Sequence, residues 1–359
     1  MSQTFQPFWK RFQQDKSARE AYLLKIQILR HIRDFFTQRG FLEFEAPILQ
    51  PALIPESYLD VFATEERRVG LEGKESRPLY LLTSPESFSK KMLVAGFGSN
   101  FALTKSFRNG EALSGKHMSE FSLLEWYEKS KNYEDVMRTT EELFRYIAQK
   151  VHPEAPDFLV YQGKKINIAE PWKRISINNL FKEFVSVDLE ETWDIETRAF
   201  SVKLLAEKIK HLPITVEEHT TWEELFHQLL LTYIEPYLPQ DVPVIVYDYP
   251  HELSPLAKPK RGETVKELIW AERFEVMIAG LEICNTFTEN TDADLQVKTF
   301  EAEIASIEAK GKKSYEFDYD FIEALRQGIP ECSGNALGID RMVMLFGDIK
   351  DITVFDFTR

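Results

Sequence analysis

The sequence has few of the features that mark secreted, zinc-binding or membrane proteins. It contains only two cysteines, Cys284 and Cys332, and no CxxC pair or cysteine–histidine spacing suited to zinc. No apolar run reaches the roughly 20 residues that span a bilayer. The N-terminal stretch MSQTFQPFWKRFQQDK is polar and lacks the apolar segment of a signal peptide. We therefore expect a cytoplasmic protein of a reducing compartment, with no membrane association.

Basic residues are also fewer than acidic residues. The chain has 44 Lys and Arg against 58 Asp and Glu, a net charge of −14 that is spread along the sequence. Such a surface repels a phosphate backbone, so tRNA is not an expected partner. The 43% hydrophobic and 13% aromatic content excludes a disordered chain and is ample for a large core.

Helical and strand patterns alternate without an internal repeat. Strands joined by hairpin-like connections, with grouped helices, predict an α+β fold built on a mostly antiparallel sheet flanked by helices. We expect an N-terminal extension over residues 1–20 and one catalytic domain over 21–359, with a helical insertion at about 154–215. The expected strands are 41–49, 79–83, 101–107, 121–129, 242–249 and 273–287; the expected helices are 24–36, 133–151, 222–233 and 294–312.

Three segments carry residues suited to nucleotide chemistry. Residues 106–127 are expected to form a hairpin. It either brings Arg108 and Phe121 to one ligand, as the binding of an adenine nucleotide requires, or it is a surface hairpin with a charged tip. In GNALGIDRMVML, a glycine-containing turn feeds a helix that begins before Arg341; this indicates either a phosphate site or a capped helix with a surface ion pair. Glu275 and Glu282 face each other if the chain turns at 279–280, and would bind a hard cation if buried.

Together these segments resemble a known family. FRNGE…H…EF is similar to motif 2 of the class II aminoacyl-tRNA synthetases, ALGIDRMVM to motif 3, and GFLEFEAPIL with Pro47 to motif 1, the dimer-interface strand. TSPESFSKKMLVAGF, LLEWY, YPHELSPLAK, AERFE and GLEICNTFTENTD resemble the lysyl subclass. The likeness covers roughly residues 20–359 and implies an ATP-dependent, AMP-forming amino acid ligase that functions as a homodimer.

The resemblance implies a role for each matching residue. Arg108 and Arg341 would be catalytic, binding the phosphates of ATP, and Glu275 and Glu282 would bind Mg²⁺. The full ATP site implied is Arg108, Glu111, His117, Phe121, Glu275, Glu282 and Arg341. The implied site for lysine or a lysine-type substrate is Ser84, Glu86, Glu125, Tyr127, Asn285, Phe287, Glu289 and Ala336.

Within this family the chain most resembles the elongation factor P (R)-β-lysine ligases, which attach a β-lysyl group to a lysine of elongation factor P. Motif 1 begins near residue 40, leaving no room for an N-terminal anticodon-binding domain, and Ala336 stands where tRNA-charging lysyl enzymes have glycine. Glu111 and His117 are each displaced by one position from the family pattern, and Thr286 replaces a glycine, which is expected to crowd the substrate pocket. YPHELSPLAK is closer to the tRNA-charging enzymes. Two alternatives stay open: a tRNA-charging enzyme that acts with a separate partner, and a non-catalytic regulatory paralogue.

Overall fold

The fold is seen in a computed structural model, which describes residues 7–67, 76–111, 114–169, 171–260, 269–313 and 315–358. Residues 1–6 of the expected N-terminal extension lie outside this range, as do residues 112–113 of the motif 2 loop. Among the described helices, none combines the length and apolar character that a bilayer crossing requires.

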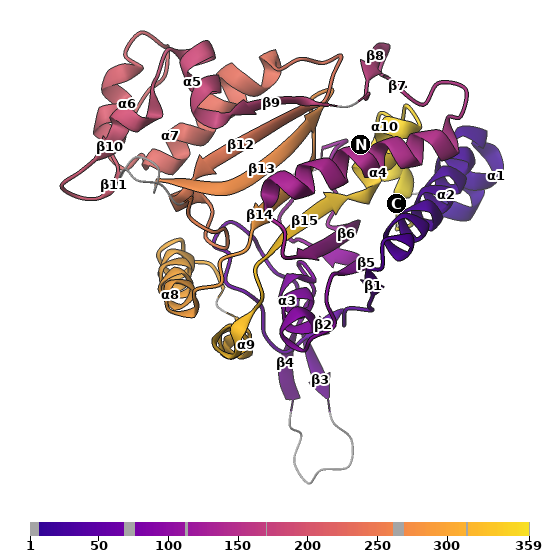
Figure 1. Cartoon of the computed structure of the whole chain (residues 1–359), viewed down its shortest axis with the longest axis horizontal. Coiled ribbons are helices and arrows are strands. Elements are labelled where there is room, and N and C mark those ends of the chain that lie inside the picture. The colour runs from indigo at the N-terminus through magenta and orange to yellow at the C-terminus, as the bar shows by residue number, and fades with distance from the viewer. Residues whose placement is uncertain are drawn as a thin grey trace.

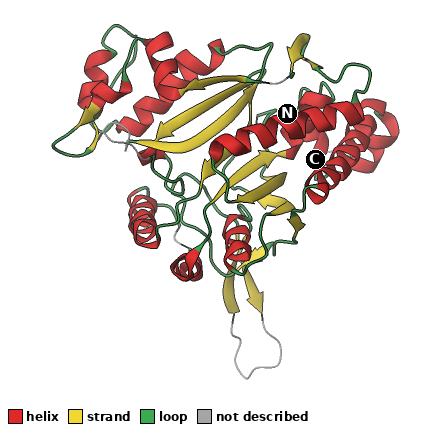
Figure 2. Cartoon of the chain, in the orientation of Figure 1, coloured by secondary structure: helices red, strands yellow, loops and turns green. Residues whose placement is uncertain are grey.

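One eight-stranded sheet organises the molecule (Figures 1 and 2). Only its two outermost pairs, β1–β5 and β12–β9, are parallel, and every pairing between them is antiparallel. This confirms the predicted α+β class with a mostly antiparallel sheet. In spatial order the strands are β1 (Leu42–Glu43), β5 (Asn100–Phe107), β6 (Glu120–Lys129), β15 (Cys332–Gly338), β14 (Leu281–Thr288), β13 (Trp270–Ile278), β12 (Val244–Pro250) and β9 (Lys173–Ser176).

Local sequence signals explain the central hairpin and the long helix behind it. Ala279 and Gly280 have φ values of 50° and 77°, so a two-residue turn of left-handed residues joins β13 to β14, a turn that the sequence analysis left open. Helix α4 (Tyr133–Val151) starts at Asn132, whose side chain accepts from the amide of Asp135 in a capping box.

Helix α4 covers one face of the sheet, and the opposite face is left for the site. Asn335 of β15 donates through Nδ2 to Thr140 Oγ1 of α4 at 3.2 Å, which fixes the side of the sheet that α4 occupies. Helices α2 (Lys16–Gln38) and α10 (Ile339–Phe346) pack into the same large core. Around the open face lie α3 (Glu86–Val94), α8 (Ala293–Ala309) and α9 (Tyr319–Gly328), which share a smaller core (Figure 1).

The two ends of the chain lie together. Arg11 of α1 (Phe8–Gln14) donates to the carbonyls of Val354 and Asp356 at 3.0 and 2.8 Å, and Phe8 stacks on Phe357 at 4.9 Å between ring centroids. Helix α1 is thus packed against residues 354–357. Helix α2 begins at Lys16, so the boundary expected at residue 20 falls within a helix.

Two predicted elements are wrong. The strand expected over 41–49 is reduced to β1 and the two-residue β2 (Leu49–Gln50), because Pro47 and an irregular segment separate them. The glycine-containing turn expected before the motif 3 helix is instead strand β15, which lies in the middle of the sheet. Gly334 and Gly338 suggested a turn, but both lie in the strand, and Gly334 allows close packing of neighbouring side chains.

Residues 154–215 are more than a helical insertion. They contain helices α5 (Ile177–Val185) and α6 (Val202–Lys208), but also the hairpin β7–β8 (Phe158–Tyr161, Lys164–Asn167), the hairpin β10–β11 (Trp193–Asp194, Ala199–Phe200) and strand β9 of the main sheet. These strands have two to four residues each, too few to produce a clear period-two pattern. Helix α7 (Trp222–Leu229) and a π-helical turn at Leu230–Ile234 continue the same layer.

A short antiparallel sheet, in the order β2–β4–β3, extends away from the body (Figure 1). Strands β3 (Ala63–Arg67) and β4 (Ser76–Leu81) form its arm; the strand predicted at 79–83 corresponds to the end of β4. Between β2 and β3, residues 51–60 pass beside the open face of the main sheet.

Candidate active site

Two adjacent rows of residues cross the sheet and form the floor of the site. In the first row Glu275, Asn285, Ala336 and Glu125 are in register across β13, β14, β15 and β6. In the second row, two residues along each strand, Arg273, Phe287, Gly334 and Tyr127 are in register. Since side chains two apart on a strand share a face, the side chains of both rows point to the side opposite α4, and Gly334 leaves that face open. Segments that are distant in sequence thus supply one surface.

A cavity of about 460 Å³ opens above part of this floor. It brings together most of the predicted nucleotide residues, and several predicted substrate residues reach it from the sheet. Its walls include Arg108, Glu111, His117, Phe121, Glu275, Glu282 and Arg341, together with Asn285, Phe287 and Ala336. The residues that the sequence analysis assigned to one nucleotide site therefore line one cavity in the structure.

Arg108 follows the end of β5, where it presents its guanidinium to the cavity. Its carbon Cζ lies 5.4 Å from the ring centroid of Phe121 on the returning strand β6. Its Nε is buried and has no hydrogen-bond partner. A buried cationic donor without a partner suits an anionic ligand, because leaving it unpaired is costly.

Arg341 lies in the first turn of α10 and crosses to the motif 2 loop. Its guanidinium donates to the carbonyl of Glu282 at 2.7 Å and contacts His117 Nε2 at 2.9 Å. Burial and the positive charge of Arg341 lower the pKa of His117, so the imidazole is neutral and can accept from the guanidinium. The one-position displacement of His117 therefore does not remove it from the site.

Glu275 and Glu282 reach the same cavity because the hairpin contains a bulge. The register shifts between Val276 and Met277, so Glu275 pairs with Asn285 while Glu282 pairs with Met277. Burial and the negative charge of Glu275 raise the pKa of Glu282. A divalent cation would relieve this repulsion, and two carboxylates suit Mg²⁺, which retains waters and phosphate oxygens as its other ligands.

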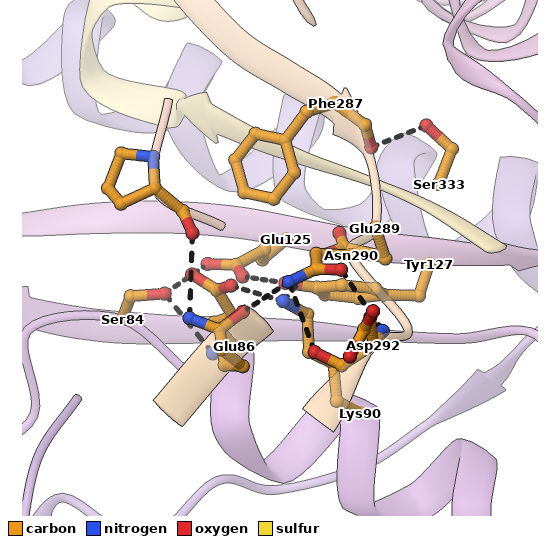
Figure 3. A network of polar contacts seen from close by, with 12 residues as sticks. Ser84, Glu86, Lys90, Glu125, Tyr127, Phe287, Glu289, Asn290, Asp292 and Ser333 are labelled. Atoms are coloured by element: carbon orange, nitrogen blue, oxygen red, sulfur yellow. Dashed lines mark hydrogen bonds and ion pairs between the residues drawn. The ribbon is translucent and has the colours of Figure 1, made fainter. Parts of the chain in front are cut away.

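Beside the cavity, a buried polar network holds the other predicted substrate residues (Figure 3). Ser84 Oγ and Tyr127 Oη each donate to Glu125, both at 2.7 Å. Burial, together with the negative charge of Glu86, raises the pKa of Glu125 to about 8. Glu125 and Glu289 are 2% and 0% exposed, so bulk water does not hydrate either carboxylate and their charged forms need partners within the protein or a ligand.

Lys90 is the functional residue that the sequence analysis missed. It lies on α3 and is 1% exposed, and its Nζ is 2.5 Å from both Glu86 and Glu289 (Figure 3). The spacing of Glu86 and Lys90, four residues apart as on successive turns of a helix, was a signal for the first of these pairs. The contact with Glu289 joins segments about 200 residues apart, as 289 − 90 = 199, and has no local signature.

Gly334 and Ala336 set the shape of the floor. A Cβ on Gly334 would come within 2.4 Å of the Tyr127 ring and 2.5 Å of Glu289 Oε1, so glycine is required for both side chains to approach. Oε1 and Oε2 of Glu289 have no hydrogen-bond partner of good geometry, although Lys90 neutralises the carboxylate. Ala336 lies between Asn285 and Glu125 in its row.

The expectation that Thr286 crowds the substrate pocket is wrong. Asn285 and Phe287 face the cavity, so the residue between them faces the opposite side of the sheet. Thr286 is fully buried there, in register with Phe274 and Asn335, on the face that α4 covers.

With this geometry in place, comparison with known proteins gives the family. The chain belongs to the class II tRNA synthetases of the D, K and N group, whose family model matches residues 9–358. A lysine–tRNA ligase of Carboxydothermus hydrogenoformans is 35% identical over 344 residues, covering 95% of this chain and 66% of that protein. Lysine–tRNA ligases of Thermoanaerobacter sp. and Chloroflexus aurantiacus are 34% and 31% identical, over 94% and 96% of this chain. The chain thus spans 64–66% of the length of these relatives.

Proposed function

We propose that the protein activates a lysine-type amino acid with ATP, forming an aminoacyl adenylate, and then transfers the acyl group to an acceptor. The observation that carries this proposal is the buried network: three carboxylates, Glu86, Glu125 and Glu289, lie close together with Lys90 as their cation. Such a cluster is short of positive charge, and a substrate ammonium would supply it.

The nucleotide would bind in the adjoining cavity. Arg108, with its unpartnered Nε, would hold the α-phosphate and the substrate carboxylate, and Arg341 would hold the terminal phosphate. Glu275 and Glu282 would hold Mg²⁺, which neutralises phosphate charge when bound. No protein nucleophile is needed, because the substrate carboxylate attacks phosphorus; the chain's contribution is positioning and charge stabilisation.

The finer proposal is that the amino acid is (R)-β-lysine and the acceptor is a lysine side chain of elongation factor P. Ala336 supports it, because its methyl group lies in register with Glu125 and occupies space where one placement of the amino group would sit. A tRNA acceptor is the second candidate, since the relatives are named lysine–tRNA ligases. The net charge of −14 disfavours it.

ATP–pyrophosphate exchange with L-lysine and with both β-lysine enantiomers tests the activation step. Co-expression with elongation factor P, followed by intact-mass measurement, tests the acceptor. A β-lysyl mass increase that requires this protein supports the finer proposal. Charging of tRNA without any change in elongation factor P would favour the second candidate.

We also propose a two-fold homodimer formed through the motif 1 region. Phe41, Phe44 and Ile48 are only half-buried, and the neighbouring Leu42 and Leu49 are 38% and 51% exposed. Closed two-fold dimers are the commonest soluble oligomers. A monomeric mass by light scattering at micromolar concentration would contradict this assembly.

A further inference from the structure

The cavity contains a carboxylate that the proposed activation step does not use. Glu56 and Tyr58, from the segment between β2 and β3, line the same cavity as Arg108. The hydroxyl of Tyr58 donates to Glu56 Oε2. Glu56 is half-buried, whereas Tyr58 is 60% exposed, so the pair extends from the site to the solvent.

The backbone of this segment is held in place by parts of the chain distant in sequence. The amide of Glu56 donates to Tyr315 Oη at 3.1 Å, and the amide of Ser57 donates to Glu303 Oε2 at 2.6 Å. A few residues further on, Lys312 pairs with Asp60 at 3.0 Å. The carboxylate is therefore presented to the cavity by a built support and does not depend on a free loop tip.

We infer that Glu56 is the general base of the transfer step, receiving a primary-amine acceptor as its ammonium ion beside the adenylate. This inference rests on the proposed function. Arg108 is assigned to the reacting carboxyl group, and Glu56 shares its cavity, so an amine held by Glu56 is close to the carbon that it attacks. The exposed Tyr58 marks the entrance for an acceptor that arrives from solvent.

The step balances in protons and bonds. The bound ammonium gives one proton to the Glu56 carboxylate, and the resulting neutral amine attacks the carbonyl carbon of the adenylate. The C–N bond forms as the C–O bond to phosphate breaks, and AMP leaves with that electron pair. The second nitrogen proton departs with the AMP phosphate, and Glu56 returns its proton to solvent.

The electrostatic surroundings suit a base at neutral pH. Burial raises the pKa of Glu56 to about 7, against the opposing effects of the Tyr58 hydrogen bond and the Arg108 charge. Glu86 and Glu303 face it from α3 and α8 and raise the pKa further, and Tyr315 contacts its backbone. A base with its pKa near the working pH combines a usable deprotonated population with sufficient proton affinity.

Two nucleophiles distinguish this role from substrate binding. Nα-acetyl-lysine amide must lose a proton before it attacks, whereas hydroxylamine is already neutral at pH 7. For Glu56→Gln we expect transfer to the lysine amide to fall about 100-fold or more, with a much smaller fall for hydroxylamine and for pyrophosphate exchange. Glu65→Gln, which removes an exposed carboxylate on β3, serves as the matched control.

The pH dependence of transfer gives a second test, which uses the variant Tyr58→Phe. Wild-type transfer to the lysine amide should rise with pH and level off above about 7, as Glu56 loses its proton. Because the Tyr58 hydroxyl stabilises the carboxylate, Tyr58→Phe should move this midpoint upward.

Several outcomes would overturn the assignment: equal slowing with both nucleophiles, a raised KM for the amino acid in exchange, an unmoved midpoint in Tyr58→Phe, or no amine-dependent AMP release by wild type. If wild type shows no exchange with any lysine-type amino acid, it is the proposed function that fails.

Discussion

The two halves of the site differ in how far water reaches their charged side chains. The nucleotide half is an open cavity, in which Glu282 is 48% exposed and lies 3.7 Å from Arg341, and Glu275 is paired with Arg273 at 2.5 Å. The amino acid half is closed, and its carboxylates are already hydrogen-bonded or paired with Lys90. A polyanion that brings its own Mg²⁺ needs flexible, hydrated partners, whereas one ammonium is selected by desolvated carboxylates of fixed geometry.

The largest effect is expected in the closed half. Glu289→Gln should raise the KM for the lysine-type amino acid roughly 150- to 5,000-fold, because removing one member of a buried ionic pair costs about 3–5 kcal/mol. The KM for ATP should change little. Pyrophosphate exchange over a range of both substrates measures this, with the surface variant Glu142→Gln as control. Equal losses for ATP and amino acid would contradict the division of the site into halves.

In the open half, Arg341→Ala should lower the rate of exchange roughly 30- to 1,000-fold. The variant loses a charge-assisted phosphate contact, worth about 2–4 kcal/mol in the transition state. Arg138→Ala removes an exposed arginine of α4 and should leave exchange near the wild-type rate. Exchange that is insensitive to loss of Arg341 would show that the motif 3 arginine has no role in the reaction.

Ala336 lies in register with residues of both halves, and its replacement should change selectivity more than rate. Ala336→Gly should shift the preference from β-lysine toward L-lysine by about 10- to 200-fold, the range for one methyl-sized difference in a pocket. Adenylate formation with each isomer gives the ratio. If glycine slows both isomers equally, the methyl group only rigidifies the strand.

The smallest expected effect is the pH dependence of amino acid binding, which the closed half sets. Since the pKa of Glu125 is raised to about 8, this carboxyl is largely protonated at pH 7 without substrate and must lose its proton to bind an ammonium. Affinity for the amino acid should therefore increase with pH, by up to about tenfold per unit, and level off above 8. Calorimetry in buffers of different ionisation enthalpy would detect the released proton, and Glu125→Gln should reduce its release to the part contributed by Glu289, whose pKa is also raised to about 8.

The same comparison explains how much the sequence predicted. Arg108, Phe121 and Arg341 belong to compact local motifs, and the Glu275–Glu282 hairpin follows from a recognisable turn, so the sequence alone indicated which residues would line the same cavity; their roles toward ATP stay predictions. Lys90 was missed because its pairing with Glu289 depends on the tertiary fold. Thr286 was misplaced although strand alternation already assigns it to the opposite face from Asn285.

The error over β15 has a physical cause. Its glycines suggested a turn, and only the approach of Tyr127 and Glu289 to Gly334 reveals why a central strand lacks side chains there. The secondary-structure propensity of residues 332–338 gives no information about these contacts, because Tyr127 and Glu289 belong to segments that are distant in sequence.

The position of β15 also has a consequence for biosynthesis. This strand, Cys332–Gly338, is inserted between β6 and β14 and joins the two parts of the sheet. A nascent chain must therefore keep the exposed edges of β6 and β14 from pairing with other molecules until β15 has left the ribosome. Neither floor row is continuous before that moment, so a chain that terminates before residue 332 would have no site and two aggregation-prone edges.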